Sequence, residues 1–372
     1  MPEVDKTNLL NLNRAGLERF FIGHGEKPFR ARQLMQWVHQ RGVVDFEQMT
    51  DMSKTLRALL HRNACIEFPS VVDRQVSDDG TSKWLIEVDG AENAVECVVI
   101  PEKSRTTLCI SSQVGCTLNC SFCSTAKQGF NRNLTTAEII AQLHLAHHYL
   151  LSHGKQGITN VVMMGMGEPL LNFDAVIGAI DMMCDDLAYG LSKRHVTIST
   201  AGVVPAMRRL VQETDVSLAV SLHASNDALR DQLVPINRKY PIAELMDACH
   251  SYVDGFKSRK ITFEYVMLKG VNDSLAHAAE LARLISRIPC KVNLIPFNPY
   301  PNTPYQCSDS ETIDRFREYL IAKRIVTVTR RARGDDIDAA CGQLAGQFRD
   351  RSRRSLKYQL GLNEIGGMSH AH

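Results

Sequence analysis

Three cysteines close together in the chain carry the strongest chemical signal. Cys116, Cys120 and Cys123 lie in the run GCTLNCSFC, with three residues between the first two cysteines and two residues between the last two. Three thiolates on one short loop can bind three irons of a cubane cluster, whereas an electron-transfer cluster normally takes four cysteines. The fourth iron is then open to a substrate. The spacing therefore predicts a [4Fe-4S] cluster with an open site.

A zinc site is the alternative for these cysteines. Structural zinc needs four ligands, and no fourth cysteine or histidine adjoins the run, although a distant residue could complete a site through the fold. A disulfide framework is not expected, because the total of eleven cysteines is odd and nothing marks the chain for secretion.

The composition limits the class of protein. The chain has 372 residues, of which 44% are hydrophobic and 23% charged, and this excludes a disordered chain. No apolar run approaches the roughly 20 residues of a membrane span, and the N-terminal run MPEVDKTNLL has acids and no apolar signal-peptide core. We therefore expect a cytoplasmic protein without a membrane segment. The net charge of +2 gives no overall argument for nucleic-acid binding.

The order of apolar segments predicts an α/β fold. Residues 1 to about 65 have helical spacing, and residues 84 to 100 alternate as strands do. In the helical part, one expected helix face carries Phe29, Leu34, Trp37 and Val38. From residue 106, short apolar runs alternate with helix-length segments, which is typical of βαβ units and a parallel sheet. Six or seven such units predict a full or partial (β/α) barrel, with its chemistry at the carboxyl ends of the strands. The expected barrel strands are 106–111, 158–165, 195–200, 216–222, 261–268, 292–297 and 325–329.

These patterns divide the chain into four parts. We expect a small helical N-terminal accessory domain over 1–83, connecting strands over 84–105, the partial barrel over 106–330 and a C-terminal segment over 331–372. Between residues 320 and 357 lie ten Lys or Arg and four Asp, a local excess of +6 that fits phosphate contacts, with a solvated helix face as the alternative. The ten cations are Lys323, Arg324, Arg330, Arg331, Arg333, Arg349, Arg351, Arg353, Arg354 and Lys357.

Polar or glycine-rich positions follow four of the expected strands. Each could be an ordinary strand-end cap, but four ends that meet at one barrel mouth predict a ligand site. The residues are Gly167, Glu168, Ser199, Ser221, Leu222, His223 and Asn298.

Glu96 lies in the apolar run AVECVVIP, on the same strand face as Val98 and Ile100. A carboxylate there is either exposed on an edge or buried with a perturbed pKa. Its position alone favours the exposed alternative.

The cysteine spacing, with an aromatic residue before the last cysteine, resembles the radical S-adenosylmethionine (SAM) superfamily. The resemblance implies that the open iron binds the amino and carboxylate groups of SAM, and that one electron cleaves the sulfonium bond to give a 5′-deoxyadenosyl radical. It also implies that Gly167 and Glu168 hold the methionine amino group, and that the other strand-end residues contact the rest of the cofactor.

Longer motifs resemble one family in this superfamily, the dual-specificity rRNA and tRNA adenosine methyltransferases called RlmN. The motifs are CSFCSTAKQGFNRNL, MGMGEPLLN, SLHAS, LIPFNPYP and GDDIDAACGQL, and the resemblance runs to about residue 360. It implies methylation of adenine carbon 2 in 23S rRNA, at the peptidyl-transferase centre, and in the tRNA adenosine 3′ of the anticodon. This carbon is electron-poor and cannot attack a sulfonium methyl as an amine would, which explains the need for a radical.

The resemblance gives catalytic roles to Cys341, Cys109 and Glu96. Cys341 is methylated by one SAM molecule, and the radical from a second SAM molecule abstracts hydrogen from the new methyl group. The resulting carbon radical adds to carbon 2 and links the protein to the RNA. Cys109 then attacks the sulfur, forms a disulfide with Cys341 and releases the methylated base. Glu96 accepts the proton of the adduct, which reverses the interpretation from its position.

The implied partners are 23S rRNA, tRNA and an electron donor such as flavodoxin or ferredoxin, and we expect a monomer. The N-terminal helices could be a second RNA-binding module. Three alternatives stay open. A related resistance family methylates carbon 8 of the same rRNA adenosine with the same cysteines. A glycyl-radical activase shares the cluster but would not need Cys109 and Cys341. A non-enzymatic iron–sulfur protein, binding RNA or transferring electrons, is disfavoured by the missing fourth ligand.

Overall fold

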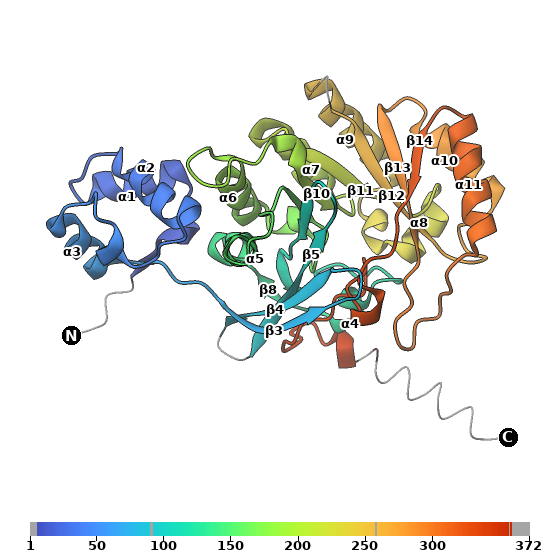
Figure 1. Ribbon diagram of the computed structural model, residues 1–372. Coiled ribbons are helices and arrows are strands. Elements are labelled where there is room, and N and C mark those ends of the chain that lie inside the picture. The colour runs from blue at the N-terminus through green and yellow to red at the C-terminus, as the bar shows by residue number, and fades with distance from the viewer. Residues whose placement is uncertain (1–5, 90–91, 257–258, 357, 359–372) are drawn as a thin grey trace.

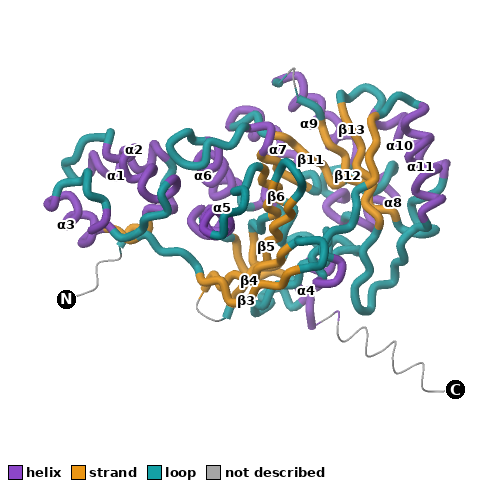
Figure 2. The backbone as a smooth tube through the Cα atoms, viewed as in Figure 1, coloured by secondary structure: helices purple, strands orange, loops and turns teal. Residues whose placement is uncertain are grey.

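A ten-stranded sheet forms the centre of the molecule (Figures 1 and 2). The computed structural model describes residues 6–89, 92–256, 259–356 and 358. The last part of the expected C-terminal segment, from residue 359, therefore lies outside the described residues.

Seven of the ten strands are parallel and follow one another in chain order across the sheet. They are β6 (Thr106–Cys109), β9 (Asn160–Met163), β10 (Val196–Thr200), β11 (Ser217–Ser221), β12 (Ile261–Met267), β13 (Cys290–Pro296) and β14 (Val326–Thr329). Each coincides with an expected barrel strand. Within the described residues the two edges of the sheet, β14 and β3 (Ser70–Val76), do not pair with each other, so the barrel is partial.

Helices connect the parallel strands. Because the strands run in chain order and such crossovers are right-handed, the connecting helices gather on one face of the sheet. They are α5 (Thr136–Ser152), α6 (Phe173–Cys184), α7 (Val204–Glu213), α8 (Asp227–Leu233), α9 (Ile242–Gly255), α10 (Leu275–Ile285) and α11 (Ser310–Ala322). Within the described part of the chain, no helix combines the length and apolar character needed to cross a bilayer.

Three antiparallel strands extend the sheet beyond β6. β5 (Asn93–Pro101) pairs with β6, β4 (Ser82–Asp89) pairs with β5, and β3 pairs with β4. The expected connecting strands are thus part of the main sheet. The boundary expected at residue 83 runs through this extension, because β3 belongs to the sheet and not to the helical lobe.

The N-terminal lobe contains α1 (Arg14–Gly23), α2 (Arg30–Met35) and α3 (Lys54–Asn63), and lies at the opposite end of the molecule from α10 and α11 (Figure 1). Its ends are joined by a short parallel pair, β1 (Thr7–Asn8) and β2 (Ala64–Cys65). Leu34 is buried in α2, whereas Phe29 lies just before the helix and does not share its face. Phe29 is 45% exposed, and its ring packs under the Arg30 guanidinium.

Candidate active site

The three clustered cysteines lie in a loop closed by a β-hairpin. β7 (Gln113–Gly115) pairs with β8 (Phe130–Asn133), and the loop between them contains the cysteines and the short helix α4 (Ser124–Gln128). The Cys116 amide donates to the Gly129 carbonyl at 2.8 Å and closes the base of the loop. Gly115 has φ +78, and a Cβ there would lie 2.3 Å from that carbonyl, so the turn requires glycine. The hairpin therefore fixes the loop just after β6.

The chemistry of the three thiols fits an iron–sulfur cluster. Burial raises the pKa of all three, to about 12 for Cys120, and the negative charge of Cys123 raises the pKa values of Cys116 and Cys120 further. Thiolates in such a site need bound cations. Among the described residues, no three His, Cys, Asp or Glu side chains converge on a point that one metal ion could occupy. In a cubane cluster each thiolate binds a different iron, so the three cysteines need not converge on one point.

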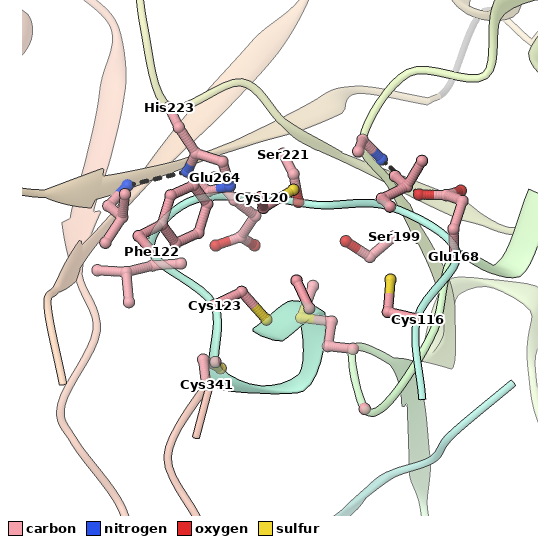
Figure 3. Close-up of a pocket in the computed structure, with 18 of the residues that line it drawn as sticks. Cys116, Cys120, Phe122, Cys123, Glu168, Ser199, Ser221, His223, Glu264 and Cys341 are labelled. Atoms are coloured by element: carbon pink, nitrogen blue, oxygen red, sulfur yellow. Dashed lines mark hydrogen bonds between the residues drawn. The ribbon is translucent and has the colours of Figure 1, made fainter. Parts of the chain in front are cut away.

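A pocket joins the cysteine loop to the carboxyl ends of the parallel strands (Figure 3). Six of the expected strand-end residues line it, and Cys341 borders it from the C-terminal segment. The six are Gly167, Glu168, Ser199, Ser221, His223 and Asn298. Leu222 is different, because its side chain is fully buried in the hydrophobic core and the residue does not line the pocket.

Glu168 is the buried acid of this pocket. One carboxylate oxygen accepts from the Ala201 amide at 2.8 Å, and the other accepts from the Leu170 amide at 3.2 Å. Burial raises the pKa of Glu168 to about 7, although these hydrogen bonds lower it in part. The preceding Gly167 has φ +102, and a Cβ there would lie 2.6 Å from the side chain of Gln113. The turn can thus adopt this shape only with glycine.

His223 links the fourth strand end to the cysteine loop. Its Nδ1 accepts from the Val266 amide at 3.1 Å, and its ring meets the Phe122 ring edge-on at 4.6 Å. Burial, together with the charge of Arg230, lowers the pKa of His223 to about 3. The ring is therefore neutral at physiological pH and acts as a fixed wall of the pocket.

Arg230 of α8 fixes two of the strand ends, a role that the sequence analysis did not predict. Its guanidinium is fully buried and donates to the Ala201 carbonyl at 2.6 Å and to the Leu222 carbonyl at 3.1 Å. A third bond of 2.8 Å reaches the Asn237 side chain. The run DALRDQL resembles an exposed helix, and only the tertiary fold turns this arginine inward.

We expect Arg230→Met to destabilise the protein strongly. The substitution leaves several buried carbonyls without a donor, which predicts a loss of about 3–5 kcal/mol in the free energy of unfolding. Urea unfolding followed by circular dichroism measures the change. Arg208→Met, at an exposed position, is the control and should change little. Equal stability of the two variants would contradict this role.

The C-terminal segment is attached to the cysteine loop. The Ser124 amide donates to the Gly342 carbonyl at 2.8 Å, and the Thr125 hydroxyl donates to the Leu344 carbonyl at 2.6 Å. The Arg354 guanidinium donates to the carbonyls of Cys116, at 3.0 Å, and of other loop residues. The chain segment that carries Cys341 is thus anchored beside the three cysteines.

Some of the cations expected to contact phosphates have partners inside the protein. Arg354 binds the cysteine loop, Arg330 lies 3.5 Å from the Cys341 sulfur, and Arg333 lies 3.5 Å from Asp79. The local excess of positive charge therefore overestimates the number of cations available to RNA. A count from the sequence cannot distinguish side chains that turn inward from those that face the solvent.

Cys109 and Cys341 line one small cavity. Cys109 is the last residue of β6 and is buried, whereas Cys341 is exposed and also borders the main pocket. Burial raises the pKa of Cys109 to about 12, and the neighbouring Cys341 raises it further. Cys341 therefore lies between the cofactor pocket and Cys109.

Glu96 is buried, so the interpretation from its position alone is wrong. Its side chain is directed inward on β5, where one oxygen lies 3.3 Å from the Lys83 ammonium. The other oxygen accepts from the Ala345 amide at 2.7 Å. Glu96 thereby contacts the loop that follows Cys341.

Comparisons with known proteins identify the family. Residues 7–66 match the ribosomal RNA large subunit methyltransferase N-terminal domain, and residues 110–282 match the radical SAM superfamily. A protein of Alkalilimnicola ehrlichii named dual-specificity RNA methyltransferase RlmN is 60% identical over 94% of this chain and 97% of its own length. A protein of the same name from Xanthomonas axonopodis pv. citri is 56% identical over 97% of this chain and 93% of its own length.

A solved structure is also similar to this chain. The crystal structure of a radical SAM methyltransferase from Sphaerobacter thermophilus is 44% identical, has a TM-score of 0.84, and covers 91% of this chain and 99% of its own. Together with the cysteine loop and its pocket, these similarities show that the chain belongs to the RlmN family of dual-specificity radical SAM RNA methyltransferases.

Proposed function

We propose that this enzyme methylates carbon 2 of an adenosine in 23S rRNA, at the peptidyl-transferase centre, and of the tRNA adenosine 3′ of the anticodon. The observation that carries the proposal is the position of Cys341, which borders both the main pocket and the cavity of Cys109. A methyl-carrying cysteine needs access to the cofactor, to the RNA base and to a resolving thiol. A glycyl-radical activase would need neither cysteine.

Different residues of the pocket bind the cluster and SAM. Cys116, Cys120 and Cys123 hold the [4Fe-4S] cluster, and Gly167 and Glu168 hold the amino group of SAM. When bound, the cluster and SAM supply a methyl group and a 5′-deoxyadenosyl radical. Residues at three further strand ends then orient the cofactor, with Leu222 contributing only through its backbone. The residues are Ser199, Ser221, Leu222, His223 and Asn298.

The catalytic residues act in sequence, with two SAM molecules per turnover. The Cys341 sulfur takes a methyl group, and the methyl carbon later loses hydrogen and bonds to carbon 2 of the adenine. Glu96 accepts the proton of the adduct, which its buried position beside the Cys341 loop supports. Cys109 attacks the Cys341 sulfur, so that a disulfide forms as the base leaves. We also propose a cytoplasmic monomer that receives electrons from flavodoxin or ferredoxin.

Nucleoside mass spectrometry tests the function. Unmodified rRNA and tRNA are incubated with the anaerobically reconstituted enzyme, SAM and reductant, then digested. The proposal predicts 2-methyladenosine in both RNAs. 8-Methyladenosine instead would assign the related carbon-8 activity, and no methylated adenosine despite an intact cluster would favour the activase or the non-enzymatic protein.

The pKa of Glu168 gives a separate prediction for SAM binding. Burial raises this pKa to about 7, and the ionised carboxylate accepts a much stronger hydrogen bond from the SAM amino group than the protonated acid does. Affinity should therefore fall as the pH decreases from 8 to 6, approaching about tenfold per unit below pH 7. Equilibrium dialysis with labelled SAM measures this affinity at each pH. Glu168→Gln should bind weakly without this dependence, and an unchanged dependence in that variant would contradict the assignment.

A further inference from the structure

Arg330 lies between a buried carboxylate and the methyl-carrying cysteine. It directly follows β14, where its amide donates to the Leu294 carbonyl at 2.8 Å. One guanidinium nitrogen, Nη1, lies 3.5 Å from the Cys341 sulfur and 3.7 Å from a carboxylate oxygen of Glu264. The same nitrogen lies 3.5 Å from the Met164 sulfur. A cation in this position contacts the atom that must become a nucleophile.

Glu264 explains why Arg330 stays in place. It occupies the middle of β12, is 2% exposed, and lines the main pocket. One of its oxygens accepts from the Asn293 side chain at 2.9 Å, whereas the buried Oε2 finds no hydrogen-bond donor among the described residues. The ion-pair partner of this oxygen is Arg330. A lone acid inside the apolar run ITFEYVML was a signal that could have been found in the sequence.

We propose that Arg330, positioned by Glu264, stabilises the thiolate of Cys341 and so activates this residue for its own methylation. The inference rests on the proposed function, in which Cys341 carries the methyl group. The Cys341 S–H bond loses its proton to the solvent, to which this residue is exposed. The thiolate electron pair forms the new sulfur–carbon bond, the sulfonium carbon–sulfur bond breaks, and S-adenosylhomocysteine leaves. Arg330 remains protonated throughout.

The charges around Cys341 support this role. The thiol of Cys109 shares this cavity and stays protonated near neutral pH, because burial raises its pKa to about 12, so it adds no charge beside the Cys341 sulfur. The contact with Asn298 involves the Cys341 carbonyl, at 3.4 Å, and not its sulfur. The charge of Cys341 is the main factor that raises the pKa of Arg330, with Glu264 and Cys109 adding to it against the effect of burial. Arg330 therefore keeps its charge in this partly buried position.

Thiol alkylation tests the inference without RNA and without SAM. The cluster-containing enzyme, prepared with Cys341 unmethylated, is treated with iodoacetamide between pH 5 and 10, and peptide mass spectrometry follows the Cys341 peptide alone. Arg330→Met should raise the midpoint of alkylation by about one pH unit or more, because an adjacent opposite charge shifts a pKa by this amount. Arg330→Lys should restore part of the shift. Arg331→Met removes an equal charge one residue further along, at an exposed position, and should leave the midpoint unchanged.

Self-methylation gives the second measurement. With SAM present, Arg330→Met should acquire the methyl group on Cys341 at least about tenfold more slowly at pH 7, since one pKa unit is a tenfold change in thiolate. Glu264→Gln should slow the reaction in the parent enzyme but not in the Arg330→Met background, because Glu264 acts through Arg330. Additive effects of the two substitutions would refute the positioning role.

Two further measurements distinguish a misfolded variant from one that has lost the proposed role of Arg330. Formation of 5′-deoxyadenosine on reduction shows that the cluster and its pocket are intact in each variant. An alkylation midpoint and a methylation rate equal to those of the parent enzyme in Arg330→Met would overturn the proposal. A wrong RNA product would instead refute the proposed function, and the alkylation result would be unaffected by it.

Discussion

Replacing Arg354 by methionine should remove most of the iron from this enzyme. The Arg354 guanidinium donates to the carbonyls of Cys116 and Thr117, each at 3.0 Å, and of Ala126 at 3.2 Å, with a further bond to Leu118. Cys116 carries one of the three cluster thiols, and the other three residues belong to the same loop. A hydrogen bond from a charged group contributes roughly 1.5–3 kcal/mol. Losing several of them should weaken cluster binding at least about 100-fold.

Iron and sulfide analysis after anaerobic reconstitution and desalting measures this loss. Arg353→Met is the matched control, because it removes the same charge from the neighbouring exposed residue. The control should retain the iron of the parent enzyme. If Arg354→Met also retained it, the guanidinium would not be needed to shape the loop, and its effect would be confined to the C-terminal segment.

The sequence predicted the parallel sheet because its information is local. A buried strand such as β12 is a short apolar run, and all seven of its residues are buried in the structure. The cysteine loop is equally local, since its spacing alone fixes how many irons it can bind. Strand-end residues such as Ser199 and Ser221 then meet in one pocket because parallel strands end at the same edge of the sheet.

Contacts between distant segments could not be predicted in this way. Arg230, Arg330 and Arg354 each occur among polar residues, and their sequence neighbours do not reveal that their guanidinium groups turn inward. Glu96 was interpreted from its position as exposed, because an acid on a strand near the edge is usually exposed. In the structure it is buried. Its burial depends on Lys83 of the neighbouring strand and on Ala345, which lies far along the chain. Resemblance to a family supplied the role of Glu96, and the position of the residue did not.

Replacing Cys109 by alanine should cause a covalent protein–RNA adduct to accumulate. In the proposed reaction, the carbon that links Cys341 to the adenine is released only when the Cys109 sulfur attacks the Cys341 sulfur. The two cysteines line the same cavity, and Cys109 is the last residue of β6. Without this thiol the earlier steps still occur, so the enzyme should stop with one RNA bound per active site and release almost no methylated product.

Denaturing gel electrophoresis with labelled RNA detects the adduct, and mass spectrometry after nuclease digestion should find a nucleotide on the Cys341 peptide. Cys97→Ala is the matched control, because Cys97 is equally buried on the adjacent strand β5 but lines neither cavity. It should turn over normally. The double variant Cys109→Ala/Cys341→Ala should form no adduct while still cleaving SAM. Normal turnover by Cys109→Ala would mean that the adduct is resolved without this thiol, and the proposed order of steps would fail.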